Sequence, residues 1–143
     1  MALGIPLIAI PTLDIVAAAQ PGFPGLLIAV LQAGRGRICA GGYRWQEDSD
    51  PCWRSLEDVR IVSWESLLDS VMEKTLICGE IDNTWRAFIE QSGKSIHLAR
   101  PAFSLRRAGF LAELAWTRWQ NGQFDDPALA TPLYLHQPGV PNP

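Results

Sequence analysis

The strongest constraint on the fold of this chain is an apolar hairpin pattern between Leu26 and Tyr43. Six apolar residues in succession (26–31) are followed by the turn sequence Gln32-Ala33-Gly34-Arg35-Gly36, and apolar residues return over 38–43. An apolar run without polar alternation is typical of a strand covered on both faces, and the two glycines supply the positive φ angles of a tight turn. The pattern predicts a buried β-hairpin.

The residue at the end of the first predicted strand also limits function. Actin-like ATPases begin a lobe with a strand and a glycine-bearing turn, and an acidic residue at the strand end organises metal and phosphate. Gln32 occupies that position here. A neutral amide does not anchor Mg²⁺ as a carboxylate does, so we predict neither a bound metal nor a cofactor.

Composition indicates one globular domain. The chain has 143 residues, of which 48% are apolar and 19% charged, and its formal net charge is −3. Such a chain buries about 70% of its unfolded surface, and its acidity argues against a strongly basic nucleic-acid binder. We find neither a membrane-length apolar run nor a signal peptide pattern, and Cys39, Cys52 and Cys78 have no C-x-x-C spacing. We therefore predict reduced thiols in a cytoplasmic protein.

Periodicity and turn residues predict the other elements. The expected order is a strand at 4–10, a helix capped by Thr12, the hairpin, a loop at 46–51, a strand at 59–62, a helix capped by Ser63, a strand at 75–78, a helix at 84–91, a strand at 95–98, and a long helix from near Ser104 to Asn121-Gly122. The long helix is expected to place one apolar stripe toward the core, formed by Leu105, Ala108, Ala112, Ala115, Trp116 and Trp119.

Three antiparallel strands followed by alternating helices and strands give the order of a ribonuclease-H-like lobe, an α/β fold in which helices cover the faces of a mixed sheet. We predict one such lobe over residues 1–136, followed by a Pro-rich tail at 137–143.

Three sequence blocks resemble signatures of the TsaB (YeaZ) family. Residues 3–14 (LGIPLIAIPTLD) are similar to its Gly-Ile-Pro, strand, Ser/Thr-Leu-acidic signature. Residues 33–38 (AGRGRI) are similar to its Asp-Ala-Arg-x-Gly-Glu-Val-Tyr hairpin, and residues 132–136 (PLYLH) resemble its closing Pro-x-Tyr-Leu-Arg. The blocks occur in the family's order but match only its rear, carboxyl-terminal lobe of the actin-like ATPase fold. The front lobe, with its first actin-like hairpin, has no counterpart in this sequence.

The resemblance implies a non-catalytic paralogue of the TsaD transferase. TsaD places a threonylcarbamoyl group on N6 of the adenosine beside the anticodon of tRNAs, which gives t6A. The resemblance therefore implies a scaffold subunit of the t6A machinery that contacts tRNA only indirectly. TsaB contacts TsaD mainly through its front lobe, so we expect the isolated rear lobe to bind TsaD weakly or not at all.

Departures from the family pattern also argue against a nucleotide site. Gln32 stands where the family usually has Asp, Arg37 where it has Glu, and His136 where it has Arg. The turn Gly79-Glu80-Ile81 lacks the second glycine with which nucleotide-binding relatives let adenine approach the backbone.

Some relatives are labelled glycoproteases, but the residues of a protease are missing. The two histidines, His97 and His136, lie far apart in the sequence, and there is no H-E-x-x-H motif. Cys39 and Cys78 lie in apolar strand-like runs, where burial raises a thiol's pKa. We predict a protein without catalytic residues.

Two groups of residues are candidates for partner binding. Arg100, Arg106 and Arg107 place positive charge near the first turn of the last helix, where the helix dipole disfavours it by a few tenths of a kcal/mol. Solvated arginines that cover apolar surface are the default interpretation. Trp45, Trp53 and Trp64 lie in or beside predicted loops. Packing in the core or at its rim is their default, and an exposed aromatic patch for a protein partner is the sharper hypothesis.

Two alternatives remain beside the scaffold role. A stand-alone interaction module would form a homodimer through its tryptophan-bearing surface, and a degenerate nucleotide-binding enzyme would retain the fold with a weakened site.

Overall fold

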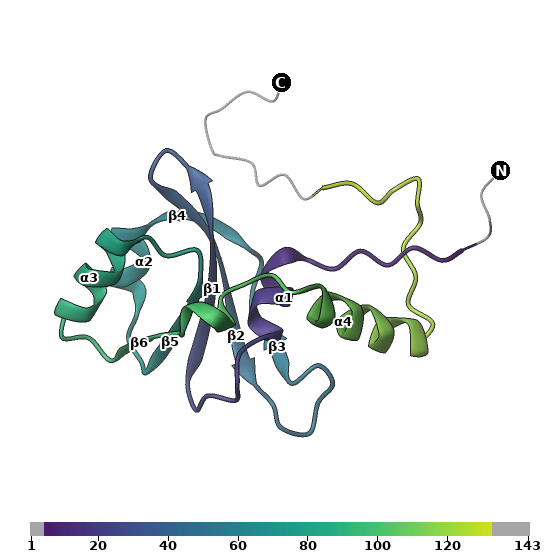
Figure 1. The fold of residues 1–143 in the computed structure, drawn as a ribbon, viewed down its shortest axis with the longest axis horizontal. Coiled ribbons are helices and arrows are strands. Elements are labelled where there is room, and N and C mark those ends of the chain that lie inside the picture. The colour runs from purple at the N-terminus through teal and green to yellow at the C-terminus, as the bar shows by residue number, and fades with distance from the viewer. Residues whose placement is uncertain (1–4, 133–143) are drawn as a thin grey trace.

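The computed structural model describes residues 5–132 and contains one six-stranded mixed sheet with helices on both sides (Figure 1). The elements are α1 (Thr12–Ala18), β1 (Leu26–Gly34), β2 (Arg37–Trp45), β3 (Trp53–Ser55), β4 (Arg60–Ser63), α2 (Trp64–Ser70), β5 (Thr75–Gly79), α3 (Asn83–Gln91), β6 (Ile96–Leu98), the 3₁₀ helix η1 (Pro101–Phe103) and α4 (Ala108–Gln120).

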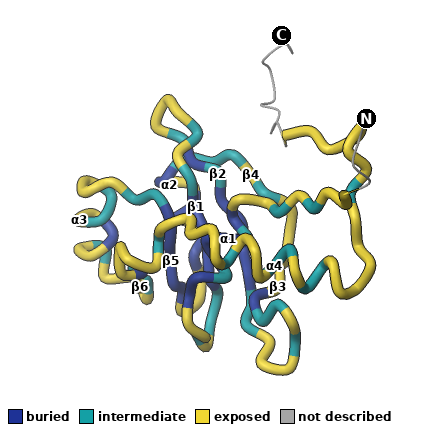
Figure 2. Tube along the Cα trace, turned by 45° about the vertical axis from the view of Figure 1, so that its right-hand side comes forward, coloured by how far each residue is buried: buried dark blue, intermediate teal, exposed yellow. Residues whose placement is uncertain are grey.

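The predicted hairpin forms the centre of the sheet. Strands β1 and β2 pair antiparallel from Leu26↔Arg44 to Gln32↔Ile38, and their turn has positive φ at Gly34, Arg35 and Gly36. In Figure 2 the buried colour is concentrated on β1, β2 and β5. The prediction of a buried hairpin is confirmed.

The strand order is β3-β2-β1-β5-β6, and β4 also pairs with β2. Strands β5 and β6 run parallel to β1, because the chain returns through α2 and α3 between successive strands. An antiparallel hairpin followed by parallel crossovers is the order predicted for a ribonuclease-H-like lobe.

Each face of the sheet has its own core because strand side chains alternate. On one face, α1 packs through Leu13 and Val16 against Leu27 and Ala29 of β1. On the other face, α2 and α3 cover Ile28 and Val30. The unbroken apolar run of β1 is therefore buried on both faces of the sheet.

Local signals account for several helix ends. The Ser63 hydroxyl accepts a hydrogen bond from the Ser66 N–H and caps α2, as predicted, and the Asp82 side chain caps α3. Gly122, with φ 67°, follows the end of α4. The Thr12 cap is wrong: the N-cap is Pro11, whose carbonyl accepts from the N–H groups of Asp14 and Ile15.

The strand expected at 4–10 does not form over the described residues 5–10. This segment makes only an isolated bridge from Leu7 to Asp125, and the Ala9 N–H donates to the Asp125 carboxylate at 2.7 Å. Its hydrogen-bonding partners are thus Asp125 after α4 and Arg118 within α4, and Pro6 has no N–H to contribute to a ladder. Conversely, β3 falls in a region where the sequence predicted no strand.

The last helix begins at Ala108, four residues later than predicted. Residues 101–103 form η1, and the Ser104 hydroxyl accepts a hydrogen bond from the Gly79 N–H at 3.2 Å, which ties this linker to the end of β5. The predicted core stripe is wrong, because α4 has no buried residue. The physical reason is that α1, and not α4, covers the sheet face that carries Leu27 and Ala29.

Candidate functional site

The candidate site is the edge formed by the carboxyl ends of the parallel strands, where open α/β sheets usually bind ligands. Val30 of β1 lies beside Gly79 of β5, and Ile77 of β5 lies beside Leu98 of β6. Gln32 and Glu80 follow these positions along their strands. The structure therefore brings together the two turns that the sequence identified.

Glu80 joins these turns to the linker before α4. One carboxylate oxygen accepts a hydrogen bond from the Gln32 N–H at 2.9 Å, and the other accepts from Arg106 at 2.9 Å. The Gln32 side-chain amide donates to the Glu80 carbonyl at 3.4 Å. The polar groups that would face a ligand at this edge are thus bonded to one another.

Gly79 allows the strands to approach closely at this edge. Its φ is 107°, a conformation that side chains rarely adopt, and an added Cβ would lie 2.0 Å from the Val30 carbonyl oxygen. The Glu80 N–H donates to that same carbonyl at 2.9 Å. A residue with a side chain at this position would collide with the Val30 backbone, so the close approach of β1 and β5 depends on glycine.

The three predicted arginines lie on the surface around this edge. Arg106 forms the ion pair with Glu80 at 2.9 Å, with about half of its side chain exposed. Arg107 is the N-cap residue of α4 and donates to the Ala102 carbonyl at 2.8 Å, whereas Arg100 precedes η1. Only Arg106 is therefore joined to the candidate site. Partner binding by all three stays a prediction.

The exposed tryptophan patch is wrong for two of its three members. Trp53 is 5% exposed and donates its indole N–H to the Gln20 carbonyl, and Trp64 is 1% exposed and stacks on Trp85. Trp45 is half-buried and packs edge-on against Trp53 with ring centroids 5.2 Å apart. Because these indoles fill the two cores and their rim, they form no common surface, and the default interpretation holds.

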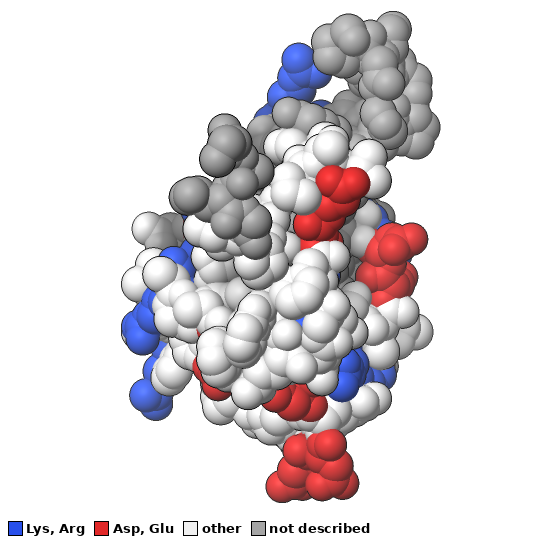
Figure 3. Space-filling view, turned by 90° about the vertical axis from the view of Figure 1, so that its right-hand side faces the viewer, with Lys and Arg blue, Asp and Glu red and all other residues white. Residues whose placement is uncertain are grey.

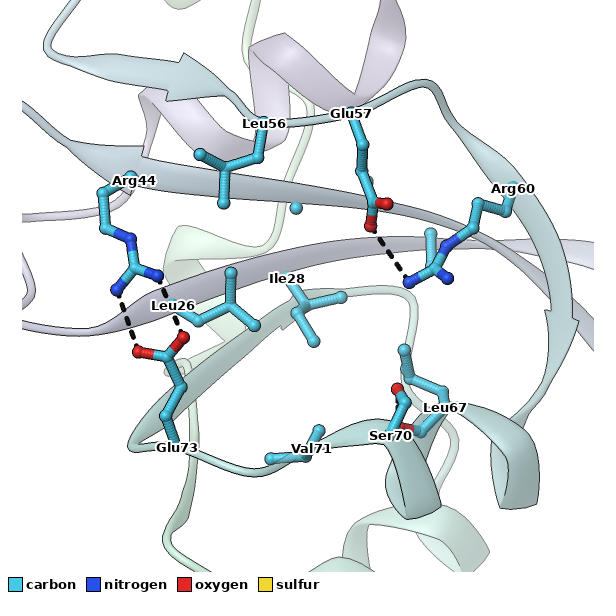
Figure 4. A pocket seen from close by; sticks show the side chains of 13 residues that line it. Leu26, Ile28, Arg44, Leu56, Glu57, Arg60, Leu67, Ser70, Val71 and Glu73 are labelled. Carbon is cyan, nitrogen blue, oxygen red and sulfur yellow. Dashed lines mark hydrogen bonds and ion pairs between the residues drawn. The ribbon is translucent and has the colours of Figure 1, made fainter.

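A pocket of about 340 Å³ lies on the α2 side of the hairpin (Figure 4). Leu26 and Ile28 lie at its floor, and its rim carries two ion pairs, Arg44 with Glu73 and Arg60 with Glu57. The Arg44 pair is bidentate, with both N···O distances 2.9 Å. Since each charge on this rim has a partner of opposite charge, the pocket offers no unpaired group to fix a charged ligand.

Two of the three cysteines, Cys39 and Cys78, are poorly suited to nucleophilic chemistry. Burial raises the pKa of the Cys39 and Cys78 thiols, so both resist forming the thiolate. Burial also raises the pKa of Asp14, although the hydrogen bond from Tyr43 at 2.7 Å acts in the opposite direction. Between residues 5 and 132, no group of three His, Cys, Asp or Glu side chains is arranged to hold a metal ion.

Sequence reasoning missed the outer surface of α4. Leu111, Trp116 and Trp119 on this helix are 38%, 55% and 45% exposed. Figure 3 views the molecule from the side at which α4 ends, and uncharged residues make up most of the visible surface. The sequence did show an apolar stripe on this helix, but a stripe indicates only that a face needs cover and not that the rest of the lobe provides it.

Among known proteins, the chain resembles solved structures but matches no family model. No curated protein matches it at a significant level. A solved structure of YeaZ from Pseudomonas aeruginosa matches at 21% identity, and a protein from the same organism described as similar to peptidase YeaZ matches at 20%. Both have a TM-score of 0.67, with 94% of this chain and 61% of the other chain covered.

At this identity the likeness establishes the fold. The chain has the mixed α/β architecture of the YeaZ structures, an actin-like, ribonuclease-H-like fold, as predicted. It spans 61% of the length of those proteins. Within residues 5–132, no helix is both long enough and apolar enough to cross a membrane.

Proposed function

We propose that this chain is the rear lobe of a TsaB (YeaZ)-type protein and acts as a non-catalytic scaffold subunit in tRNA threonylcarbamoylation. The match to YeaZ over 94% of the chain carries the proposal. Three sequence blocks in the family's order support it independently of the fold, although most of the closing block lies outside the described residues. The partner is a TsaD-like transferase, and a cytoplasmic location accompanies this role.

The geometry of the strand edge supports a role without catalysis. Glu80 uses both carboxylate oxygens within the protein, and the backbone at Gly79 lies close to that of Val30. A substrate would have to displace these bonds before it reached the sheet. The raised pKa values of the Cys39 and Cys78 thiols likewise disfavour a nucleophilic cysteine.

A chimera tests the proposal. The chain would replace the matched part of a YeaZ protein behind that protein's own front lobe, and the chimera would be mixed with the transferase and unmodified tRNA. We expect the chimera to bind the transferase and to support t6A formation, measured by mass spectrometry of tRNA nucleosides. The chain alone should bind the transferase weakly or not at all. A folded chimera that fails both assays would overturn the proposal, and tight binding by the chain alone would contradict the role assigned to the front lobe.

The alternative of a degenerate nucleotide-binding enzyme has a direct test. Calorimetric titration of the chain with Mg-ATP should show no binding tighter than about 100 μM, which corresponds to about −5.5 kcal/mol. Glu80→Ala is titrated beside the parent chain, because it removes the carboxylate that holds Arg106 and the Gln32 N–H. Tighter binding by the parent chain would mean that the bonds at this edge open for a nucleotide.

A further inference from the structure

Helix α4 has two sides with different surroundings. Phe110, Leu114 and Thr117 line a pocket together with Trp45 and Trp53, so this side faces the rest of the lobe. The Thr117 hydroxyl donates to the Asp50 carboxylate at 3.1 Å, and Arg118 donates to the Ala9 carbonyl at 2.7 Å. The polar groups of Thr117 and Arg118 are therefore bonded to other parts of the same lobe.

The opposite side of α4 is apolar along its whole length. A helix turns by about 100° per residue, which places six residues away from the lobe. These residues, called the outer α4 face below, are Ala108, Leu111, Ala112, Ala115, Trp116 and Trp119. All but the half-buried Ala115 are exposed, and the rings of Trp116 and Trp119 stack with centroids 4.8 Å apart. Alanines between large side chains let a second helix approach closely.

Charges of opposite sign lie at the two ends of this face. Arg106 and Arg107 precede the first turn of α4, and that turn contains no acidic residue. Asp125 and Asp126 follow the last turn, and the backbone bridge to Leu7 and the ion pair with Arg118 at 3.2 Å hold Asp125 beside the helix. Asp126 is exposed, and within residues 5–132 neither it nor Arg107 forms an ion pair.

This charge distribution fits a second copy of the same chain. When two copies pack their outer α4 faces antiparallel about a two-fold axis, Arg107 of each copy lies toward the Asp126 end of the other. The two helix dipoles then also run in opposite directions, and the positive charge that is misplaced at the helix amino end gains an acidic neighbour. A parallel arrangement would instead place like charges together.

We propose that the chain forms a symmetric homodimer through the outer α4 face, with the helices antiparallel. The stacked tryptophans and the alanines form its apolar centre, and Arg107 and Asp126 form its charged rim. A 13-residue helix is about 20 Å long, so the interface is small and the dimer is a weak one, with a dissociation constant in the micromolar range. This inference does not rest on the proposed function.

Sedimentation velocity of the full 143-residue chain, from about 1 to 500 μM, tests the dimer. We expect a reversible monomer–dimer equilibrium that Ala112→Glu weakens at least tenfold, because this change places a charge in the apolar centre. Met72→Glu is the matched control, since Met72 is 91% exposed in the loop after α2, away from α4. It should leave the equilibrium unchanged. Circular dichroism of both variants should match the parent, because neither position is buried.

A charge exchange tests the antiparallel orientation. Arg107→Asp and Asp126→Arg should each weaken the dimer by about threefold to tenfold, as expected for charges at an interface rim. The double variant should return to within about threefold of the parent, because the exchanged charges face each other again. Arg107→Asp also introduces a preferred N-cap residue, so unfolding of α4 does not explain its effect.

Three results would overturn the proposal. They are a chain that stays monomeric to 500 μM, a dimer that is indifferent to Ala112→Glu, and a dimer in which the double charge exchange fails to restore association. The first would indicate that the outer α4 face is covered by a different protein, and binding of the parent chain to a separately expressed YeaZ front lobe would identify that case.

Discussion

The β1–β2 hairpin and helix α4 have similarly apolar sequences but opposite environments. Val30 and Ile38 in the hairpin are 0% exposed, whereas Trp116 and Trp119 in α4 are 55% and 45% exposed. The hairpin is covered by α1 on one face and by α2 on the other. Only one side of α4 meets the lobe. Apolar composition thus predicts that a surface needs covering, but not whether this chain supplies the cover.

The comparison also separates the two groups of tryptophans. Trp53 and Trp64 lie in sequence regions that suggest loops, yet they fill the cores, whereas Trp116 and Trp119 lie on a predicted core stripe and face solvent. If the outer α4 face binds a second copy, these two indoles become the anchors of an interface, which is a common role of exposed tryptophan.

The largest difference is expected between the glycines at the ends of β5 and α4. Gly79→Ala should lower the free energy of unfolding by about 4 kcal/mol or more, because the new Cβ meets the Val30 carbonyl in a strained conformation. Gly122→Ala should cost only about 1 kcal/mol, since its φ is 67° but nothing lies within 4 Å of the added atom. Urea denaturation of both variants measures this, and equal losses would contradict the close approach at the strand edge.

Tryptophan truncation should separate core from surface almost as strongly. Trp64→Ala should destabilise the monomer by about 3 to 5 kcal/mol, because it empties a fully buried site. Trp116→Ala should change monomer stability by less than about 1 kcal/mol, because more than half of this side chain is already in water. Denaturation is measured at a protein concentration well below the dissociation constant of the dimer, so that only the stability of the monomer is compared. A large loss for Trp116 would show that the outer α4 face is covered within one chain.

Within the hairpin we expect Ile38→Ala to cost about 2 to 4 kcal/mol and Val30→Ala about 1.5 to 3 kcal/mol. Both side chains are buried in the core beneath α2, and Ile38 loses more carbon. Leu111→Ala on α4 is the matched control, with an expected loss below about 0.5 kcal/mol. Hairpin losses as small as that of the control would contradict the buried position of β1 and β2.

The smallest effect concerns pH at the junction of α1 and β2. Burial raises the pKa of Asp14 above its ordinary value of about 4, so the protonated carboxyl is favoured in the folded state. The resulting stabilisation is complete below the ordinary pKa and is lost as the pH rises through the folded pKa. Asp14→Asn retains an oxygen acceptor for Tyr43 but does not titrate.

The measurement is the free energy of unfolding of parent and Asp14→Asn from pH 3 to pH 7. The parent should lose stability relative to the variant as the pH rises through this window. A gain for the parent over the same window would mean that the hydrogen bond from Tyr43 outweighs the desolvation of the carboxylate.

Local sequence signals predicted much of the fold because they act over a few residues. The apolar run of β1, the glycines around Arg35 and the Ser63 cap each follow from neighbouring residues. They also led to the correct order of hairpin, crossover helices and parallel strands. The start of α4 was misplaced because Ser104 bonds to Gly79, a residue 25 positions earlier in the chain. Of the candidate site, the sequence located the turns at Gln32 and Glu80 but not the bond from Arg106 that joins them to the α4 linker.

The sequence by itself determined which segments need apolar cover, where the chain turns, and that Gln32 replaces a carboxylate at the strand edge. The tertiary structure alone decided which cover each segment receives: α1 and not α4 packs on the sheet face that carries Leu27 and Ala29, and the segment at 5–10 bonds to Asp125 after α4. The physical reason is that hydrophobic burial is non-directional, so a pattern of apolar residues specifies a buried face without specifying its partner. The choice of partner depends on shape, connection length and charge, and in α4 it leaves an apolar face with arginines at one end and aspartates at the other.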